Sequence, residues 1–138
     1  MKNLLLIIIL IAGWAHKAFA YDMTCTTLFE DQVRYKSLLG VPEKHLPRLF
    51  FNNNVPSKNS VILLVHGLFE SPYFLKGIGE KFADSGYLVL SILLPGHWEG
   101  NLKALGDIKY QNWVKEVNMN IEIANCFSNK LIVAGHSL

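Results

Sequence analysis

The sequence contains few charged residues and few cysteines. Asp, Glu, Lys and Arg make up only 17% of its 138 residues, and the two cysteines are Cys25 and Cys126. No spacing of cysteine and histidine resembles a zinc site, and no cluster of lysine or arginine could follow a phosphate backbone. We therefore expect no metal, no other cofactor and no nucleic-acid partner.

The small positive charge belongs to the first 20 residues. The formal net charge is +2, and this segment holds Lys2 and Lys17 but no acidic residue. The rest of the chain therefore carries eleven basic and eleven acidic side chains and is neutral. A neutral chain gives no electrostatic reason to expect nucleic-acid binding.

The same 20 residues have the pattern of a secretory signal peptide. A cationic start precedes nine apolar residues, Leu4 to Ala12, and the small-x-small site Ala18-Phe19-Ala20. We expect cleavage before Tyr21 and an exported product, periplasmic or secreted. A membrane anchor is the alternative, but a spanning helix needs about 20 apolar residues, and His16 and Lys17 interrupt this run.

Export bears on the two cysteines. In an exported protein, Cys25 and Cys126 could form a disulfide. A free buried thiol at Cys126 is an equal alternative, and Cys25 could have a partner outside this sequence.

Residues 21–57 form an N-terminal segment with only a weak periodic pattern. Apolar residues among charged ones predict a short helix around Phe29 to Leu39. Arg48 to Phe51 is predicted to be a short strand, because a turn-forming cluster at residues 52–57 follows it.

Residues 58–138 alternate between buried strands and helices. The predicted strands are apolar runs, which indicates that helices cover both faces: Val61 to Val65, Tyr87 to Leu94, and Leu131 to Ala134. Helices between such strands predict right-handed βαβ crossovers. The expected fold class is therefore α/β, a parallel sheet with flanking helices.

The first of these helices has clear start and stop signals. Ser71 is predicted to be its N-cap, with Pro72 at the first helical position, and Gly86 ends it. Its apolar face is expected to contain Phe74, Ile78 and Phe82.

The second helix is predicted from Tyr110 to about Cys126. Asp107 is expected to cap it. Its apolar residues fall on one face at helical spacing: Trp113, Val114, Val117, Ile121 and Ala124.

In open parallel sheets, ligands bind beyond the carboxyl ends of the strands. Residues 66–68, residues 95–100 and Ser137 follow the three predicted strands. Three loops are therefore expected to meet at one place.

The last four residues, Gly135 to Leu138, fill four positions of the nucleophile elbow Gly-x-Ser-x-Gly. A serine hydroxyl is a weak nucleophile, so it must be presented at a strained turn near donors that stabilise an oxyanion. We expect Gly135 to let the turn close against neighbouring backbone. The backbone amides of Leu138 and Leu68 are expected to be the oxyanion donors.

These motifs together resemble a known family. Val-His-Gly-Leu-Phe after one strand, Leu-Pro-Gly-His after the next, a Trp-bearing helix and Gly-His-Ser-Leu are similar to the N-terminal half of an α/β-hydrolase. The most similar branch is the monoacylglycerol lipase, lysophospholipase and serine aminopeptidase-like group. The resemblance covers about residues 58 to 138.

The resemblance implies Ser137 as the nucleophile and the amides of Leu68 and Leu138 as the oxyanion hole. His66, Gly67, Gly135 and His136 are implied to support the motif. In that family the acid and the base of the triad follow the serine, and nothing follows Leu138 in this sequence. The resemblance thus implies a truncated domain that ends at the elbow and is inactive alone.

None of the three histidines near these loops is expected to be the catalytic base. His66 is predicted to bond backbone, and His97 to order its loop. His136 is predicted to point away from the nucleophile.

The favoured function is a serine hydrolase of carboxylic esters, with an acylglycerol or lysophospholipid-like substrate and an acyl-enzyme intermediate. A thioesterase, a serine aminopeptidase and a carbon-carbon bond hydrolase are alternatives within the class. A non-catalytic remnant that binds a lipid or a partner is the alternative from another class. Transient contact with a membrane or lipid surface is expected, and residues 21–138 alone are expected to aggregate because the third strand would be left bare.

Overall fold

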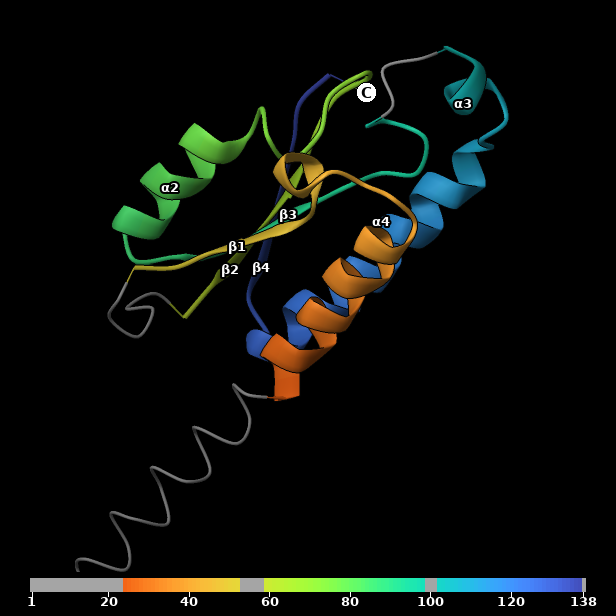
Figure 1. Cartoon of the computed structure of the whole chain (residues 1–138). Helices are drawn as coiled ribbons and strands as arrows, with labels where there is room; N and C mark the ends of the chain where they lie inside the picture. Colours follow the sequence, from red (N-terminus) through yellow and green to blue (C-terminus); the bar gives the residue numbers. More distant parts are fainter. Residues whose placement is uncertain (1–23, 53–58, 99–101, 138) are drawn as a thin grey trace, which may run out of the picture.

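The computed structural model describes residues 24–52, 59–98 and 102–137, which form a mixed α/β fold (Figure 1). The predicted signal peptide and Leu138 lie outside the described residues. Within these three ranges, no helix has both the length and the apolar content needed to cross a membrane.

A four-stranded sheet forms the centre of the fold, in the order β1-β3-β2-β4. Both β3 and β4 run parallel to β2, as the sequence predicts, whereas β1 runs antiparallel to β3. The sheet is therefore mixed rather than wholly parallel. Its strands are β1 (Arg48–Phe50), β2 (Val61–Val65), β3 (Leu88–Ile92) and β4 (Leu131–Gly135).

The three parallel strands end at the same level. Val65, the last residue of β2, lies opposite Ile92 of β3 and Gly135 of β4. The loops that follow these strands therefore leave from one end of the sheet, where the sequence predicts the site.

Helices cover both faces of this sheet. One face carries the N-terminal helix (residues 24–38) and α4 (Tyr110–Phe127), and the other carries α2 (Lys76–Asp84), as Figure 1 shows. The short elements η1 (Glu43–His45) and α3 (Leu102–Gly106) lie in the connections.

The core has two parts because successive side chains of a strand point to opposite faces. Leu63 of β2 packs with Phe29 of the N-terminal helix and Ile123 of α4. Leu64 packs on the other face, against Phe82 of α2. All residues of β2 and β3 are buried, as predicted for strands covered on both sides.

A disulfide joins Cys25 to Cys126, across a sequence separation of 101 residues. It connects the N-terminal helix to the C-terminal end of α4. The sequence left open whether these two cysteines pair, and in the structure they are bonded to each other.

The predicted start of α2 is wrong. The helix begins at Lys76, because residues 71–75 form turns in which an amide donates to the carbonyl three residues earlier, as Phe74 does to Ser71. The Ser71 hydroxyl lies 2.7 Å from Nδ1 of His45 and makes no helix cap.

The predicted apolar face of α2 is also largely wrong. Phe74 and Ile78 are 60% and 46% exposed. The helix instead buries Gly79 and Ala83. A Cβ at Gly79 would lie 2.6 Å from the ring of Phe50 on β1, so the missing side chain lets helix and strand approach closely.

Two further boundaries differ from the sequence expectation. The N-terminal helix is already formed at residue 24 rather than 29, and α3 was not predicted. Asp107 does not cap α4. The side chain of Asn112 does so, since its oxygen accepts a hydrogen bond of 3.1 Å from the Lys109 amide.

Among the described strands, β4 lies at an edge of the sheet and is paired with β2. Ile132 and Val133 are about half exposed there. The strand contains no charged residue or proline to discourage pairing with another strand.

Candidate active site

Ser137 lies two residues beyond the end of β4, in the loop that follows the strand. Its φ is +44°, in the left-handed region that non-glycine residues rarely adopt. Such a conformation costs of order 1–3 kcal/mol and is concentrated at functional sites. The strained turn that a nucleophile elbow requires is therefore present at the serine.

Two backbone hydrogen bonds hold the loop after β2 against the loop after β4. The amide of His136 donates to the carbonyl of Val65 at 3.1 Å, and the amide of Leu68 donates to the carbonyl of Ser137 at 3.0 Å. The predicted oxyanion donor Leu68 thus lies beside Ser137. Its N–H is engaged by the carbonyl of the serine itself, so this bond must open before the amide can stabilise an oxyanion.

The close approach between the two loops depends on Gly67. A Cβ at this position would lie 2.7 Å from the backbone oxygens of both His136 and Ser137. At Gly135 the nearest atom would be the Val65 oxygen at 3.9 Å, an ordinary contact. The glycine that lets the turn close against neighbouring backbone is therefore Gly67, and not Gly135 as predicted.

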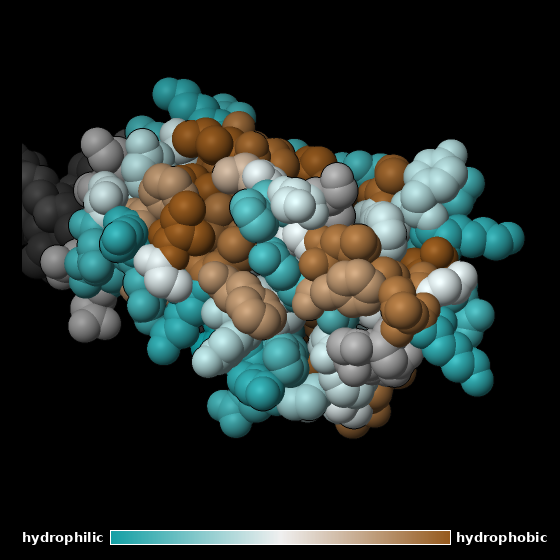
Figure 2. Space-filling model, turned by 90° about the horizontal axis from the view of Figure 1, so that it is seen from above, coloured by the Kyte–Doolittle hydropathy of each residue, from teal (hydrophilic) through white to brown (hydrophobic). Residues whose placement is uncertain are grey.

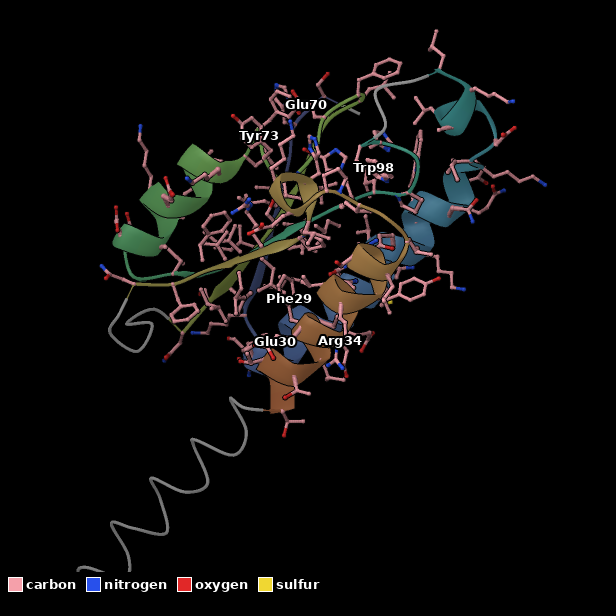
Figure 3. The ribbon with its side chains drawn as sticks, in the orientation of Figure 1. Phe29, Glu30, Arg34, Glu70, Tyr73 and Trp98 are labelled. Atoms are coloured by element: carbon pink, nitrogen blue, oxygen red, sulfur yellow. A yellow bond between two sulfur atoms is a disulfide. The ribbon has the colours of Figure 1, made fainter. Side chains whose placement is uncertain are left out.

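Glu70 joins the same two loops through its carboxylate. Its Oε2 accepts a hydrogen bond of 2.9 Å from the Gly67 amide and lies 3.2 Å from Nδ1 of His136. The Gly67 hydrogen bond, and then the neighbouring His136, lower the pKa of this carboxyl. Figure 3 labels Glu70 at the end of the sheet where β2 finishes.

Sequence reasoning did not find Glu70. One signal was available, because Glu70 is the only Asp, Glu, Lys or Arg between Val61 and Leu75. A single carboxylate in a loop of apolar and small residues needs a hydrogen-bonding partner. In the structure its partners are the Gly67 amide and the His136 ring.

His66 is fully buried and uses both ring nitrogens on backbone. Nδ1 lies 2.9 Å from the Gly67 carbonyl, and Nε2 accepts a hydrogen bond of 3.0 Å from the Leu94 amide. The neutral ring therefore carries its proton on Nδ1. Its two backbone bonds tie the loop after β2 to the residues after β3, as predicted. Burial lowers the pKa of His66 to about 4.

We expect this histidine to make stability depend on pH. The folded pKa of about 4 lies below the value of about 6.5 for an unfolded chain, so between these values the unfolded state binds the extra proton. The free energy of unfolding should therefore fall by about 3 kcal/mol as pH falls from 6.5 to 4. Urea melts of the protein and of His66→Asn measure the difference, and an NMR titration in which the ring protonates near pH 6.5 would contradict it.

His97 and Trp113 order the loop after β3. Nδ1 of His97 and Nε1 of Trp113 lie 3.0 and 3.1 Å from the same carbonyl, that of Pro95. The His97 ring also contacts His66 edge-on, with ring centroids 5.0 Å apart. Burial lowers the pKa of His97, and the predicted role in ordering the loop fits these contacts.

Of the predicted site residues, the structure brings together Gly67, Leu68, His136 and Ser137. Among the described residues, no histidine ring is hydrogen-bonded to the Ser137 hydroxyl. The same part of the chain holds no cluster of three or more His, Cys, Asp or Glu that could bind a metal ion. The geometry thus presents a serine and a backbone amide without an adjacent base.

Two apolar grooves lie between the N-terminal helix and α4, with volumes of about 530 and 480 Å³. They share Tyr35, Lys36, Glu116 and Met119, and the larger one reaches Leu94 at the end of β3. Neither groove is lined by Ser137 or Leu68.

Comparison with known proteins gives a similarity in fold but none in sequence family. No protein-family model matches the chain, and no curated protein matches its sequence. A solved structure from a study of LipS and LipT, described as two metagenome-derived lipolytic enzymes, is similar with a TM-score of 0.59 and 20% sequence identity. The similarity covers 69% of this chain and 36% of the other. The chain is therefore similar in fold to part of that structure and spans about a third of that protein's length.

Proposed function

We propose that this protein supplies the nucleophile and part of the oxyanion hole of a serine hydrolase that cleaves carboxylic esters. The observation that carries the proposal is the left-handed Ser137, two residues after a parallel strand and held against Leu68 by a backbone hydrogen bond. The similarity in fold to a lipolytic enzyme supports the same reaction class. The proposed enzyme is of the α/β-hydrolase type.

In this reaction the Ser137 oxygen attacks the ester carbonyl, the alcohol leaves, and water then hydrolyses the acyl-enzyme. The amides of Leu68 and Leu138 would stabilise the oxyanion of each tetrahedral intermediate. His66 is not proposed as the base, because both of its ring nitrogens are bonded to backbone. A thioesterase, an aminopeptidase and a carbon-carbon bond hydrolase would use the same parts.

The surface beside Ser137 favours an apolar acyl group. Leu68, whose amide donates to the Ser137 carbonyl, and the next residue, Phe69, are each exposed by 45% or more. Apolar side chains gather in patches on the face seen in Figure 2, which looks onto the ends of the strands. An acylglycerol or lysophospholipid, met at a membrane or lipid surface, matches such a surface.

The disulfide supports export as part of the proposal. Disulfides persist in oxidising compartments and are rare in the cytosol. Cys25–Cys126 is buried at Cys25 and joins two helices. We therefore propose that the predicted signal peptide directs the protein out of the cytoplasm.

A non-catalytic lipid-binding role is the second candidate. The observation in its favour is that the Leu68 amide is engaged by the Ser137 carbonyl while apolar grooves of about 530 and 480 Å³ lie open elsewhere. Such volumes suit a small apolar ligand.

A fluorophosphonate probe distinguishes the two candidates. In the protein isolated from its native host, the probe is expected to label Ser137, and Ser137→Ala should remove the label. Gly67→Val should slow labelling about a hundred- to a thousandfold, because it displaces the Leu68 amide. Ser85→Ala, which changes an exposed serine at the C-cap of α2, is the matched control and should label normally.

Absence of label on the native protein, together with retention of a radiolabelled monoacylglycerol, would favour the lipid-binding candidate instead. Label that persists in Ser137→Ala would assign the nucleophile to another residue.

A further inference from the structure

Glu70 forms hydrogen bonds with both the carbonyl and the amide of Gly67. The Glu70 amide donates to the Gly67 carbonyl at 3.2 Å, while the Glu70 carboxylate accepts from the Gly67 amide at 2.9 Å. His66 adds a second hydrogen bond, of 2.9 Å, to the same Gly67 carbonyl. Gly67 therefore has little freedom to rotate about its own backbone bonds.

The direction of the Leu68 amide follows from this anchoring. The Gly67 carbonyl and the Leu68 N–H belong to one planar trans peptide unit, so they point in opposite directions. Fixing the carbonyl toward His66 and the Glu70 amide consequently aims the Leu68 N–H away from them, toward Ser137. The observed hydrogen bond of 3.0 Å from Leu68 to the Ser137 carbonyl agrees with this direction.

The Glu70 carboxylate also reaches the second loop. Its Oε2 lies 3.2 Å from Nδ1 of His136, the residue before Ser137, although 66 residues separate the two in sequence. This side-chain contact adds to the backbone bond between His136 and Val65. One carboxylate oxygen thus joins the loop that carries the amide donor to the loop that carries the serine.

We propose that Glu70 is a positioning residue for the serine site: its carboxylate holds Gly67 and His136 so that the Leu68 amide faces Ser137. This proposal rests on the proposed function, because the position of the Leu68 amide matters for catalysis only if Ser137 is the nucleophile. The geometry of the two loops can be measured without any reaction.

Amide hydrogen exchange of the disulfide-bonded full chain tests this role directly. Glu70→Ala is expected to raise the exchange rates of the Gly67 and Leu68 amides about tenfold or more, because a charge-assisted hydrogen bond is lost. Glu70→Gln, whose amide oxygen can still accept from Gly67, should restore part of the protection. Amides in β2 and β3 should exchange as in the unchanged protein.

Glu80→Ala is the matched control, because Glu80 is an exposed carboxylate on α2 that pairs with the exposed Lys76, at 3.6 Å. It should leave Leu68 exchange unchanged. Unchanged Leu68 exchange in Glu70→Ala, or equal loosening in Glu80→Ala, would overturn the proposal.

The rate of fluorophosphonate labelling links the positioning to the chemistry. Glu70→Ala should slow labelling at least tenfold, with an unchanged urea midpoint, and Glu70→Gln should recover part of the rate. If the unchanged protein takes no label, the proposed function fails, and the exchange rates still decide the role of Glu70.

Discussion

Removal of the Cys25–Cys126 disulfide is expected to lower the free energy of unfolding by about 4 to 5 kcal/mol. The bond closes a loop of 101 residues, and the entropy that a cross-link removes from the unfolded chain grows with loop length. Small domains are stable by about 5–15 kcal/mol in total. The double variant Cys25→Ala, Cys126→Ala should therefore be close to its unfolding midpoint without denaturant.

Urea melts of the oxidised protein, the reduced protein and the double variant measure this effect. The reduced protein and the double variant should melt at similar urea concentrations, since both lack the cross-link. A double variant with the midpoint of the oxidised protein would show that the N-terminal helix is held by its packing alone.

The elements that the sequence predicts well are those whose pattern is local. The run Val61 to Val65 has no polar residue, which predicts a strand covered on both faces, and β2 is buried along its whole length. The predictions of β2, β3, β4 and α4 depend only on such runs and on helical spacing. Their types and order are confirmed.

The errors occur where a distant residue decides the local structure. Sequence spacing favoured Phe74 and Ile78 as the buried face of α2, but the ring of Phe50, on β1, fills the space beside Gly79. Ser71 has the properties of an N-cap, yet its hydroxyl contacts His45, 26 residues earlier. Neither contact has a signal within the helix sequence itself.

The candidate site was predicted in part for the same reason. Ser137, Leu68 and Gly67 belong to motifs with a fixed local pattern, and the structure places them together. The contact between Glu70 and His136 joins two loops 66 residues apart, which the parallel pairing of β2 with β4 brings to the same end of the sheet. Local sequence patterns therefore could not predict this contact, because it depends on how these two strands pair.

A second contact between the N-terminal helix and α4 is the ion pair of Lys36 and Glu116. Nζ of Lys36 lies 2.9 Å from Oε1 of Glu116, and the two side chains are only 10% and 9% exposed. Lys36 also donates to the Leu93 carbonyl at 3.1 Å. The same Glu116 oxygen accepts from Gln32 and Asn120 at 3.3 and 3.2 Å.

This network reaches the candidate site through the end of β3. Leu93 is bonded by Lys36, and the next residue, Leu94, donates its amide to His66. The N-terminal helix is thus connected to the loop that holds Gly67 and Leu68. Loss of the ion pair should affect both stability and the order of that loop.

Lys36→Met is expected to lower the free energy of unfolding by about 3–5 kcal/mol, because it leaves the Glu116 carboxylate buried without its cation. The double variant Lys36→Met, Glu116→Leu should recover much of this loss, since an apolar pair of similar volume does not require solvation. Lys76→Met is the matched control: its pair with Glu80 is about half exposed, and its removal should cost less than about 1 kcal/mol. Urea melts of the unchanged protein, Lys36→Met, Glu116→Leu and the double variant give the coupling energy. Equal losses in Lys36→Met and Lys76→Met would show that the buried pair contributes no more than an exposed one.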